Sequence, residues 1–97
     1  MYARVVTAQA QPGKMDEIIS ICRDSVVPAA KEQKGFKGIF LLTNTDTNKG
    51  ISIALWETEA DMKAGEASGY LNEQIAKLAH AFAGPPTTER YEVSVQA

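Results

Sequence analysis

The stretch from residue 36 to residue 57 constrains the fold most, because it predicts a β-hairpin whose two faces are both apolar. Successive side chains of a strand point to opposite faces. In the first strand the two alternating sets are Phe36, Phe40 and Leu42, and Ile39 and Leu41. In the second strand they are Ile51, Ile53 and Leu55, and Ala54 and Trp56. An antiparallel sheet needs only one apolar face, since water solvates the other, so we expect both faces of this hairpin to be covered.

The segments before the hairpin predict a strand and a helix. Residues 2–9 favour a strand, which Pro12 and Gly13 end. Residues 14–33 carry apolar side chains at helical spacing, namely Met15, Ile18, Ile19, Cys22, Val26, Ala29 and Ala30. Pro28 lies inside this pattern and should kink or interrupt the helix, and Gly35 should end it.

The segments after the hairpin predict two helical pieces and a last strand. Thr58 should cap a short helix that runs to about Ala67. A second helical piece over residues 70–83 has an apolar stripe of Leu71, Ile75, Leu78, Ala79 and Phe82. Residues 88–96 alternate as an edge strand, with Tyr91, Val93 and Val95 inward and Arg90, Glu92, Ser94 and Gln96 outward.

The resulting order of elements is βαββαβ, which is the ferredoxin-like arrangement of the α+β class. In this arrangement both helical segments pack on one face of a four-stranded antiparallel sheet. The other face has no cover within the chain, although the hairpin makes it apolar. We therefore expect a homodimer in which two sheets pack face to face and form a dimeric α/β barrel.

Length, charge and cysteine content narrow the choice of partners. A chain of 97 residues has room for one core, so residues 1–97 should form a single domain. The net charge is −2 and no basic run is present, so we expect no nucleic-acid partner. We also expect no membrane partner, since no apolar run approaches the roughly 18 residues of a membrane span. A single cysteine cannot form an internal disulfide, which favours a cytoplasmic protein.

Three stretches of the chain resemble the antibiotic biosynthesis monooxygenase family of the dimeric α/β-barrel superfamily. They are QPGKMDEI after the first predicted strand, KGFKGIFLL at the start of the hairpin, and ISIALWETEADMKA from its end into the next helix. The most specific piece is the Trp-Glu-Thr-x-x-Asp element from Trp56 to Asp61. The family includes monooxygenases without metal or flavin, haem-degrading enzymes and isomerases of small molecules, so the resemblance predicts the fold better than the reaction.

We expect no cofactor and no metal. The haem-degrading branch of the family has an Asn, a Trp and a His at positions that hold Thr7, Lys63 and Glu73 in this chain, so haem degradation of that type is not expected. One histidine and one cysteine cannot build a typical zinc site. Gly-rich phosphate-binding motifs are absent as well.

The best candidate for a binding pocket lies around Trp56. Trp56 shares a strand face with the small residues Ser52 and Ala54, and small strand residues under a helix layer leave space. Four residues are therefore candidates to line a pocket, namely Thr7, Trp56, Met62 and Tyr70. Packing in the core is the simpler role for Trp56, and Tyr70 could present its hydroxyl either to the pocket mouth or to water.

Two charged or titratable residues are weaker candidates, and one cysteine is expected to be inert. Arg4 lies on the first predicted strand, where an ion pair with Glu57 or Glu92 is more plausible than an anchor for an anionic substrate. His80 is the only histidine, but it lies opposite the apolar stripe and should be a solvated surface residue. Cys22 falls within the buried stripe of its helix, so its thiol should pack without reacting.

The resemblance implies oxidation of a small aromatic phenol or quinol by O₂ without a cofactor. In that chemistry the deprotonated substrate reduces oxygen, and the protein supplies a dry cavity and orientation. Two alternatives stay open at this point: an isomerase or lyase of a small metabolite, and a dimer that binds a ligand or has a structural role without catalysis. A polar group held in a cavity against Trp56 favours an enzyme, whereas a cavity filled by side chains favours the structural role.

Overall fold

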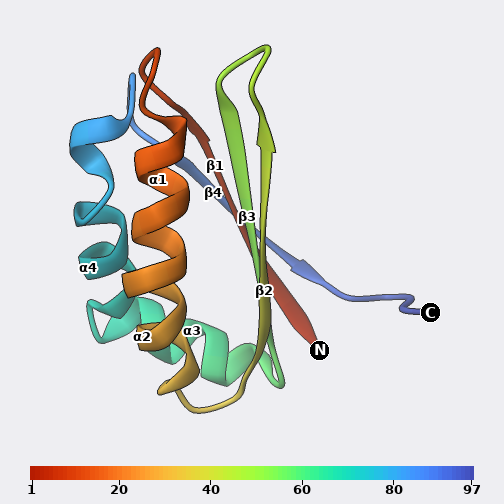
Figure 1. The fold of residues 1–97 in the computed structure, drawn as a ribbon. Coiled ribbons are helices and arrows are strands. Elements are labelled where there is room, and N and C mark those ends of the chain that lie inside the picture. The colour runs from red at the N-terminus through yellow and green to blue at the C-terminus, as the bar shows by residue number, and fades with distance from the viewer.

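The computed structural model describes residues 1–97 and contains a four-stranded antiparallel sheet with helices on one face only (Figure 1). The strands are β1 (Tyr2–Gln9), β2 (Phe36–Asn44), β3 (Lys49–Trp56) and β4 (Thr87–Glu92). They lie in the order β2-β3-β1-β4, so the first strand of the chain is central. The predicted ferredoxin-like fold of the α+β class is confirmed.

The first helical segment consists of three pieces, namely α1 (Met15–Ile21), a π-helical turn η1 (Cys22–Val26) and α2 (Val27–Lys31). Within it the backbone N–H of Val27 donates to the carbonyl of Cys22, which is the wide hydrogen-bond spacing of a π-helix. Pro28 follows at once and has no N–H of its own, so the predicted interruption is confirmed as one widened turn. Gly35 ends the segment with a φ of 79°, and a Cβ there would collide with Asp61.

The second helical segment is more broken than its apolar stripe predicts. It consists of α3 (Glu59–Ala67), α4 (Tyr70–Ala76) and a 3₁₀ turn η2 (Ala79–Ala81). The predicted cap is confirmed, because the Thr58 hydroxyl accepts a hydrogen bond from the backbone N–H of Asp61 at 3.0 Å. The prediction of a helix as far as residue 83 is wrong. The α-helix ends at Ala76 and is followed by the 3₁₀ turn. Phe82 is then extended and forms a β-bridge with Ala10.

A β-bulge changes the face that one large side chain occupies. Phe36 is paired with Trp56, but Gly38 is paired with Leu55, so Lys37 is an extra residue in β2. Phe36 therefore lies on the helix-covered face, where its ring meets Trp56 edge to face with centroids 5.7 Å apart. The prediction that Phe36 shares a face with Phe40 is wrong, because simple alternation does not include the bulge.

The last strand also differs from its predicted orientation. Strand β4 ends at Glu92, and its register places Arg90 beside Arg4 and Tyr91 beside Ala3. Arg90 therefore faces the helices, and Tyr91 lies on the uncovered face, which reverses the predicted inward and outward sets. Paired residues of an antiparallel sheet share a face, so the pairing of β4 with β1 decides which β4 side chains face the helices.

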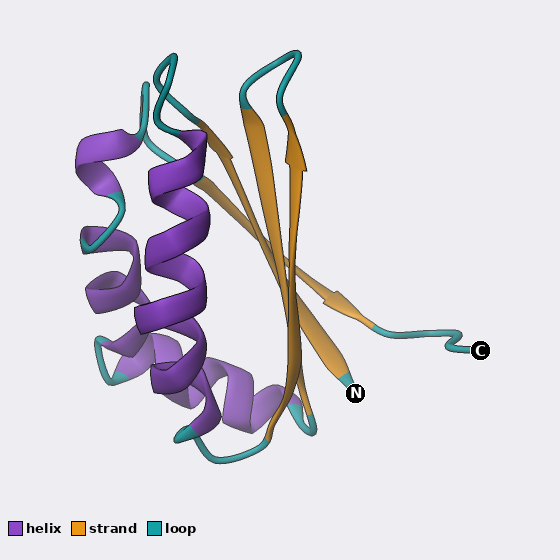
Figure 2. Cartoon of the chain, in the orientation of Figure 1, coloured by secondary structure: helices purple, strands orange, loops and turns teal.

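The two faces of the sheet have different surroundings (Figure 2). The largest fully buried side chains, Trp56 of β3 and Met62 of α3, lie between the covered face and the helices. The open face carries large side chains that no helix covers. Among them, Phe40 is 58% exposed and Leu42 is 50% exposed. None of the helices combines the length and the apolar character that crossing a membrane requires.

Candidate functional site

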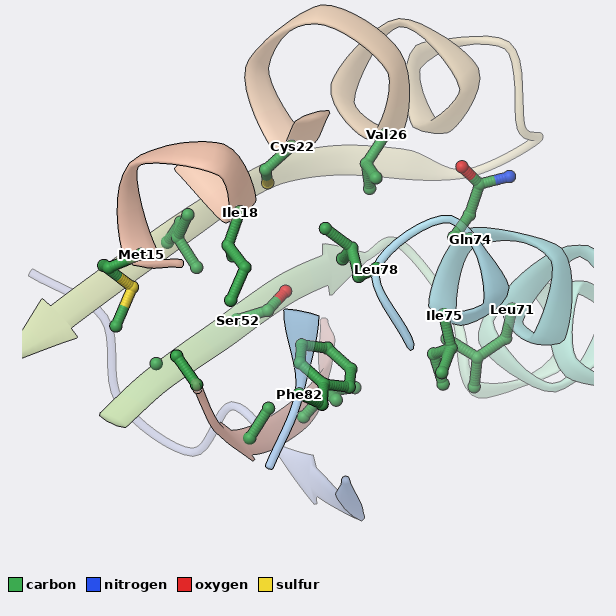
Figure 3. Close-up of a pocket in the computed structure, with 15 residues that line it drawn as sticks. Met15, Ile18, Cys22, Val26, Ser52, Leu71, Gln74, Ile75, Leu78 and Phe82 are labelled. Carbon is green, nitrogen blue, oxygen red and sulfur yellow. The ribbon is translucent and has the colours of Figure 1, made fainter. Parts of the chain in front are cut away.

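An apolar cavity of about 80 Å³ lies between the sheet and the helices (Figure 3). Side chains from β3, α1, α4 and the segment after η2 converge on it, among them Met15, Ile18, Ser52, Leu71, Ile75 and Phe82. The space exists because the strands contribute small residues beneath the helices, including Ala8, Gly50 and Ser52. An apolar chamber with few polar groups is the usual form of a small-molecule site.

A smaller cavity of about 40 Å³ adjoins the first one and extends the space toward Trp56. The two cavities share part of their walls, namely Val6, Val26, Ser52, Leu71 and Gln74. The smaller one ends at Arg4, Trp56 and Tyr70. The polar side chains of the combined space are therefore concentrated at the Trp56 end, whereas the Phe82 end is apolar.

Trp56 forms the buried wall of the smaller cavity. The residue is 1% exposed, and the rings of Phe36 and Trp56 pack edge to face. Its indole Nε1 is buried and has no hydrogen-bond partner. Leaving such a donor unpaired costs about 1–3 kcal/mol, so the packing around Trp56 has to offset that cost.

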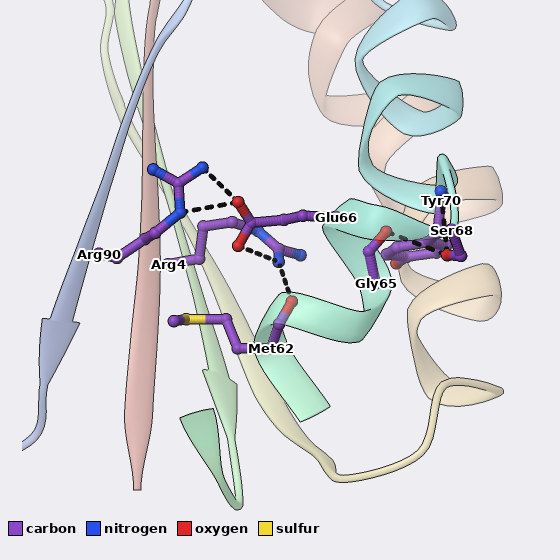
Figure 4. A network of polar contacts seen from close by, with 7 residues as sticks. All are labelled: Arg4, Met62, Gly65, Glu66, Ser68, Tyr70 and Arg90. Carbon is purple, nitrogen blue, oxygen red and sulfur yellow. Dashed lines mark hydrogen bonds and ion pairs between the residues drawn. The ribbon is translucent and has the colours of Figure 1, made fainter. Parts of the chain in front are cut away.

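Arg4 lies beside Trp56 and is 3% exposed, although it occupies a central strand. Its Nη1 donates to the carbonyl oxygen of Met62 at 3.1 Å and lies 3.5 Å from Oε2 of Glu66 (Figure 4). The guanidinium carbon is 5.1 Å from the centre of the Trp56 ring, within cation–π range. Burial lowers the pKa of Arg4 and the Glu66 carboxylate raises it, but a guanidinium stays charged.

Glu66 connects the helix layer to two strands. Its carboxylate accepts hydrogen bonds from Arg90, with Nε 2.7 Å from Oε1, and from Arg4 through the other oxygen. These contacts hold the pKa of Glu66 below its usual range, with the Arg90 hydrogen bond as the largest cause. The prediction that Arg4 pairs with Glu57 or Glu92 is wrong, because α3 crosses the sheet above Arg4 and brings Glu66 to it (Figure 4).

The structure brings together three of the four predicted pocket residues. Met62 is 2% exposed and packs in one cluster with Trp56, against which Tyr70 also packs, but Met62 lines neither cavity. Tyr70 lines the smaller cavity, and burial raises the pKa of its hydroxyl. Thr7 does not belong to this group. It pairs with Ile51, so its side chain lies on the open face of the sheet and not on the face of Trp56.

The sequence analysis missed Gln74 and Glu66. Gln74 is buried and lines both cavities, and its Oε1 accepts a hydrogen bond from Lys77 at 2.9 Å. Its position was detectable, since it is a polar residue inside the helical stripe between Leu71 and Leu78. Glu66 follows Met62 by one helical turn, but no local signal says which strand that turn crosses.

His80 and Cys22 lie where the sequence predicts them. His80 is on the surface, its side chain is 53% exposed, and its Nε2 lies 2.8 Å from Oε1 of Glu17 on α1. Cys22 is buried on the wall of the larger cavity, where burial raises the pKa of its thiol. No group of three or more His, Cys, Asp or Glu side chains is arranged to hold a metal ion.

Comparison with known sequences gives one family and a set of curated relatives. The sequence model of the antibiotic biosynthesis monooxygenase family matches residues 1–77. An uncharacterized protein of Mycobacterium tuberculosis is 33% identical over 98 residues, which cover 97% of this chain and 41% of the relative. The chain thus spans about two fifths of the length of the curated relatives it matches.

Solved structures with low sequence identity share the fold. A protein of unknown function from Nitrosomonas europaea is 21% identical with a TM-score of 0.80, over 99% of this chain and 91% of that one. A monooxygenase of Streptomyces coelicolor in complex with nanaomycin D is 22% identical with a TM-score of 0.74, over 99% and 89%. A mutant of the cofactor-independent oxygenase SnoaB of Streptomyces nogalater is 14% identical with a TM-score of 0.77, over 98% and 94%.

Proposed function

We propose a function from one premise: the chain belongs to the antibiotic biosynthesis monooxygenase family. We infer that it is a monooxygenase that oxidises a small aromatic phenol or quinol with O₂, without a metal or an organic cofactor. The observation that carries this proposal is the apolar cavity beneath the helices, whose smaller part is lined by Arg4, Trp56 and Tyr70. Two structural neighbours from Streptomyces support it, namely a cofactor-independent oxygenase and a monooxygenase in complex with nanaomycin D.

The reaction can be balanced with the substrate and oxygen alone. The ionised phenol gives one electron to O₂, and the two resulting radicals combine at a ring carbon. Loss of water then leaves a quinone, so one oxygen atom ends in the new carbonyl and the other in water. The substrate supplies all four electrons. The protein therefore needs to bind and orient the ring and to exclude bulk water.

The size of the space favours a substrate with a single ring. An apolar cavity of about 150 Å³ in another protein accepts one benzene molecule, and the two adjoining cavities here are about 80 Å³ and about 40 Å³. A single substituted ring fits if Leu71 and Gln74, which border both cavities, move apart slightly. A fused polycyclic system would require much larger movements of α4.

The route into the cavity passes the segment after η2. An open depression at the surface is formed in part by Gly84, Pro85 and Pro86. It shares Ile75 and Phe82 with the cavity, so these two side chains separate the interior from solvent. A ligand would enter past Phe82, which is half-buried and packs against the buried cluster that contains Ala10 and Met15.

The homodimer is part of the same proposal. The open face carries large side chains on β2, β3 and β4, with Ala3 of β1 between Leu55 and Tyr91; they are Phe40, Leu42, Ile51, Ile53, Leu55 and Tyr91. A second copy of the chain would cover these side chains sheet against sheet, and two identical flat apolar faces complement each other about a two-fold axis. Such dimers usually bury more than about 2,000 Å² in total.

Oxygen consumption tests the proposed activity. The purified protein is mixed with a panel of single-ring hydroquinones and catechols in an oxygen electrode, and a heat-denatured sample subtracts autoxidation. We expect oxygen uptake above that control for at least one compound, together with quenching of the single tryptophan, Trp56, on binding. Absence of both signals across the panel would contradict the proposal.

A ligand-binding protein without catalytic activity is the second candidate. It is favoured by the lack of an obvious general base, because the titratable side chains that line the two cavities are only Arg4, Tyr70 and Cys22. None of these ordinarily accepts a proton near neutral pH, and burial raises the pKa of both Tyr70 and Cys22. Quenching of Trp56 without oxygen uptake would identify this candidate as the correct one.

A further inference from the structure

We propose that the open depression beside Pro85 and Pro86 binds an aliphatic chain, which is attached to the aromatic ring that the cavity holds. The substrate class is then a single-ring phenol or quinol with an uncharged chain. This inference rests on the proposed function for the ring, and it adds a second site for the rest of the molecule. It concerns binding, so it can be tested without any reaction.

The two cavities and the depression form one elongated series of spaces. The larger cavity shares wall residues such as Leu71 and Gln74 with the smaller cavity, and it shares Ile75 and Phe82 with the depression. The smaller cavity and the depression have no lining residue in common. The larger cavity therefore lies between the other two, and a ligand that fills it can extend toward Trp56 in one direction and toward solvent in the other.

The depression is suited to an uncharged, apolar group. It measures about 340 Å³, and no charged residue lines it. Apart from the two side chains that it shares with the cavity, it is formed by Ala79, Ala83, Gly84, Pro85 and Pro86. Apolar residues that gather at one place on the surface indicate a binding site, unlike apolar residues that are exposed singly. A charged substituent would find no partner here, whereas a hydrocarbon chain would be removed from water.

A chain fits the boundary between the cavity and the depression better than a second ring does. Ile75 and Phe82 border both spaces, so any group that joins the two must pass these side chains. A methylene chain is the narrowest apolar group that can do so. A ring would have to displace Phe82, which packs against the buried cluster that contains Ala10 and Met15. The group that occupies the depression is therefore aliphatic.

The walls of the depression are held in place by β1 and the residues that follow it. The side-chain amide of Gln11 donates to the carbonyl oxygen of Phe82 at 3.0 Å. The backbone N–H of Ala83 donates to the carbonyl oxygen of the last residue of β1 at 2.7 Å. Pro85 and Pro86 each have a fixed φ. Because the walls are preformed, little ordering is required on binding, and contact with a chain should increase the affinity.

A groove between the first helical segment and β2 also adjoins the larger cavity. It shares Cys22 and Leu41 with that cavity and measures about 290 Å³. Its lining includes the charged residue Arg23 and the polar residue Thr43, so it is less apolar than the depression. An aliphatic chain should prefer the depression for this reason. The groove is the competing location that the test has to distinguish.

The test uses phenol and its 4-ethyl, 4-butyl and 4-hexyl derivatives under nitrogen, so that no oxidation occurs. Binding is followed by the fluorescence of Trp56, the only tryptophan. We expect the Kd to fall about twofold to fourfold for each methylene added from ethyl to hexyl, as burial of hydrocarbon predicts. The carboxylate analogue 3-(4-hydroxyphenyl)propanoate should bind more weakly than 4-propylphenol, because its charge would have no partner in the depression.

Two variants form a matched pair, because each places a glutamate at an exposed position beside the larger cavity. Ala79→Glu introduces a carboxylate into the depression, and Thr43→Glu introduces one into the groove along β2. We expect Ala79→Glu to reduce the affinity gain from ethyl to hexyl by at least about tenfold, and Thr43→Glu to keep it. Gly84→Asp is a second variant in the depression, where an added Cβ would meet no atom within 4 Å. It should have the same effect if Ala79→Glu does not fold.

Equal Kd values along the alkyl series, or tighter binding of the propanoate than of 4-propylphenol, would overturn the proposal. A chain gain that Thr43→Glu reduces as much as Ala79→Glu does, or more, would overturn it as well. A gain that only the depression variants reduce, in a protein that consumes no O₂ with any quinol, would support the chain site and reject the monooxygenase activity. Oxygen uptake with unsubstituted hydroquinone but no chain gain would do the reverse. The two proposals therefore fail separately.

Discussion

The covered and open faces of the hairpin have similar sequence character but different chemical roles. On the covered face Ser52 and Ala54 are small and Trp56 is fully buried, and a cavity lies between them and the helices. On the open face Phe40 and Leu42 are large and exposed. Apolarity alone thus does not distinguish a ligand chamber from an assembly surface. Side-chain size and the cover above each face make the distinction.

The largest expected effect comes from removing the buried wall of the covered face. Trp56→Ala should lower the free energy of unfolding by about 3–5 kcal/mol, because it empties a site that is 1% exposed. The same truncation at Leu42, which is 50% exposed on the open face, should cost much less. Urea denaturation of both variants at one protein concentration gives the comparison, and equal losses would show that the two faces are equally buried in solution.

The next effect should appear on the open face. Phe40→Asp places a charge where two sheets are proposed to meet, and loss of a central interface aromatic typically costs about 2–4 kcal/mol of association. We expect light scattering at micromolar concentration to show a dimer for the wild type and a folded monomer for the variant. Thr43→Asp, at an exposed position near the end of the same strand, is the control and should remain dimeric. A wild type that is already a compact monomer would contradict the dimer.

The fold was predictable from the sequence because each signal was local or periodic. Alternation gave the hairpin, the stripe from Met15 to Ala30 gave the first helix, and Thr58 gave a helix start, all of which the structure confirms. The bulge at Lys37 was not predictable, because the residues around Lys37 have a pattern that is ordinary for a regular strand. It moved Phe36 to the covered face.

The site was only partly predictable, because it depends on register between distant segments. Trp56 and Tyr70, which line the smaller cavity, were predicted from the small strand residues and from the helical segment that follows, whereas Met62 packs beside Trp56 without lining a cavity. Thr7 was predicted on the wrong face of the sheet. Its face depends on its pairing with Ile51 of β3, and the sequence does not show that pairing. The partner of Arg4 depends on how α3 crosses the sheet, 62 residues farther along the chain, and no local pattern encodes that crossing.

The ion-pair network of the covered face should make stability depend on pH. Glu66→Gln removes the carboxylate that Arg4 and Arg90 share, and it should cost about 2 kcal/mol at neutral pH, the range for hydrogen bonds to charged groups. The folded-state pKa of Glu66 is lowered. Its contribution is therefore complete above the ordinary carboxyl pKa and is lost as the pH falls through the lowered value. Urea midpoints from neutral to acid pH should converge for the two proteins, and a constant difference would contradict this assignment.

Two substitutions on opposite faces of the sheet test whether the ligand binds in the cavity or on the open face. Ser52→Leu adds bulk at a residue that lines both cavities, so it should weaken binding of a single-ring phenol by about tenfold. Thr7→Leu enlarges a residue of the neighbouring strand β1 on the open face and should leave that affinity unchanged. Titration of Trp56 fluorescence measures both. Equal weakening would mean that the ligand does not occupy the space under the helices.

The smallest effect should come from His80, which belongs to neither face. Its side chain forms a hydrogen bond with Glu17 at the surface, and this bond lowers the pKa of the Glu17 carboxylate. His80→Ala should shift the midpoint of thermal unfolding by about 2 °C or less, since exposed ion pairs contribute little. Any oxygen uptake should be retained too, because His80 lines neither cavity. The comparison with Glu17→Gln controls for the ion pair. A loss of turnover in His80→Ala but not in Glu17→Gln would show that His80 acts as a base on the substrate, and the reacting position would then have to lie at the outer surface of the helix layer rather than beside Trp56.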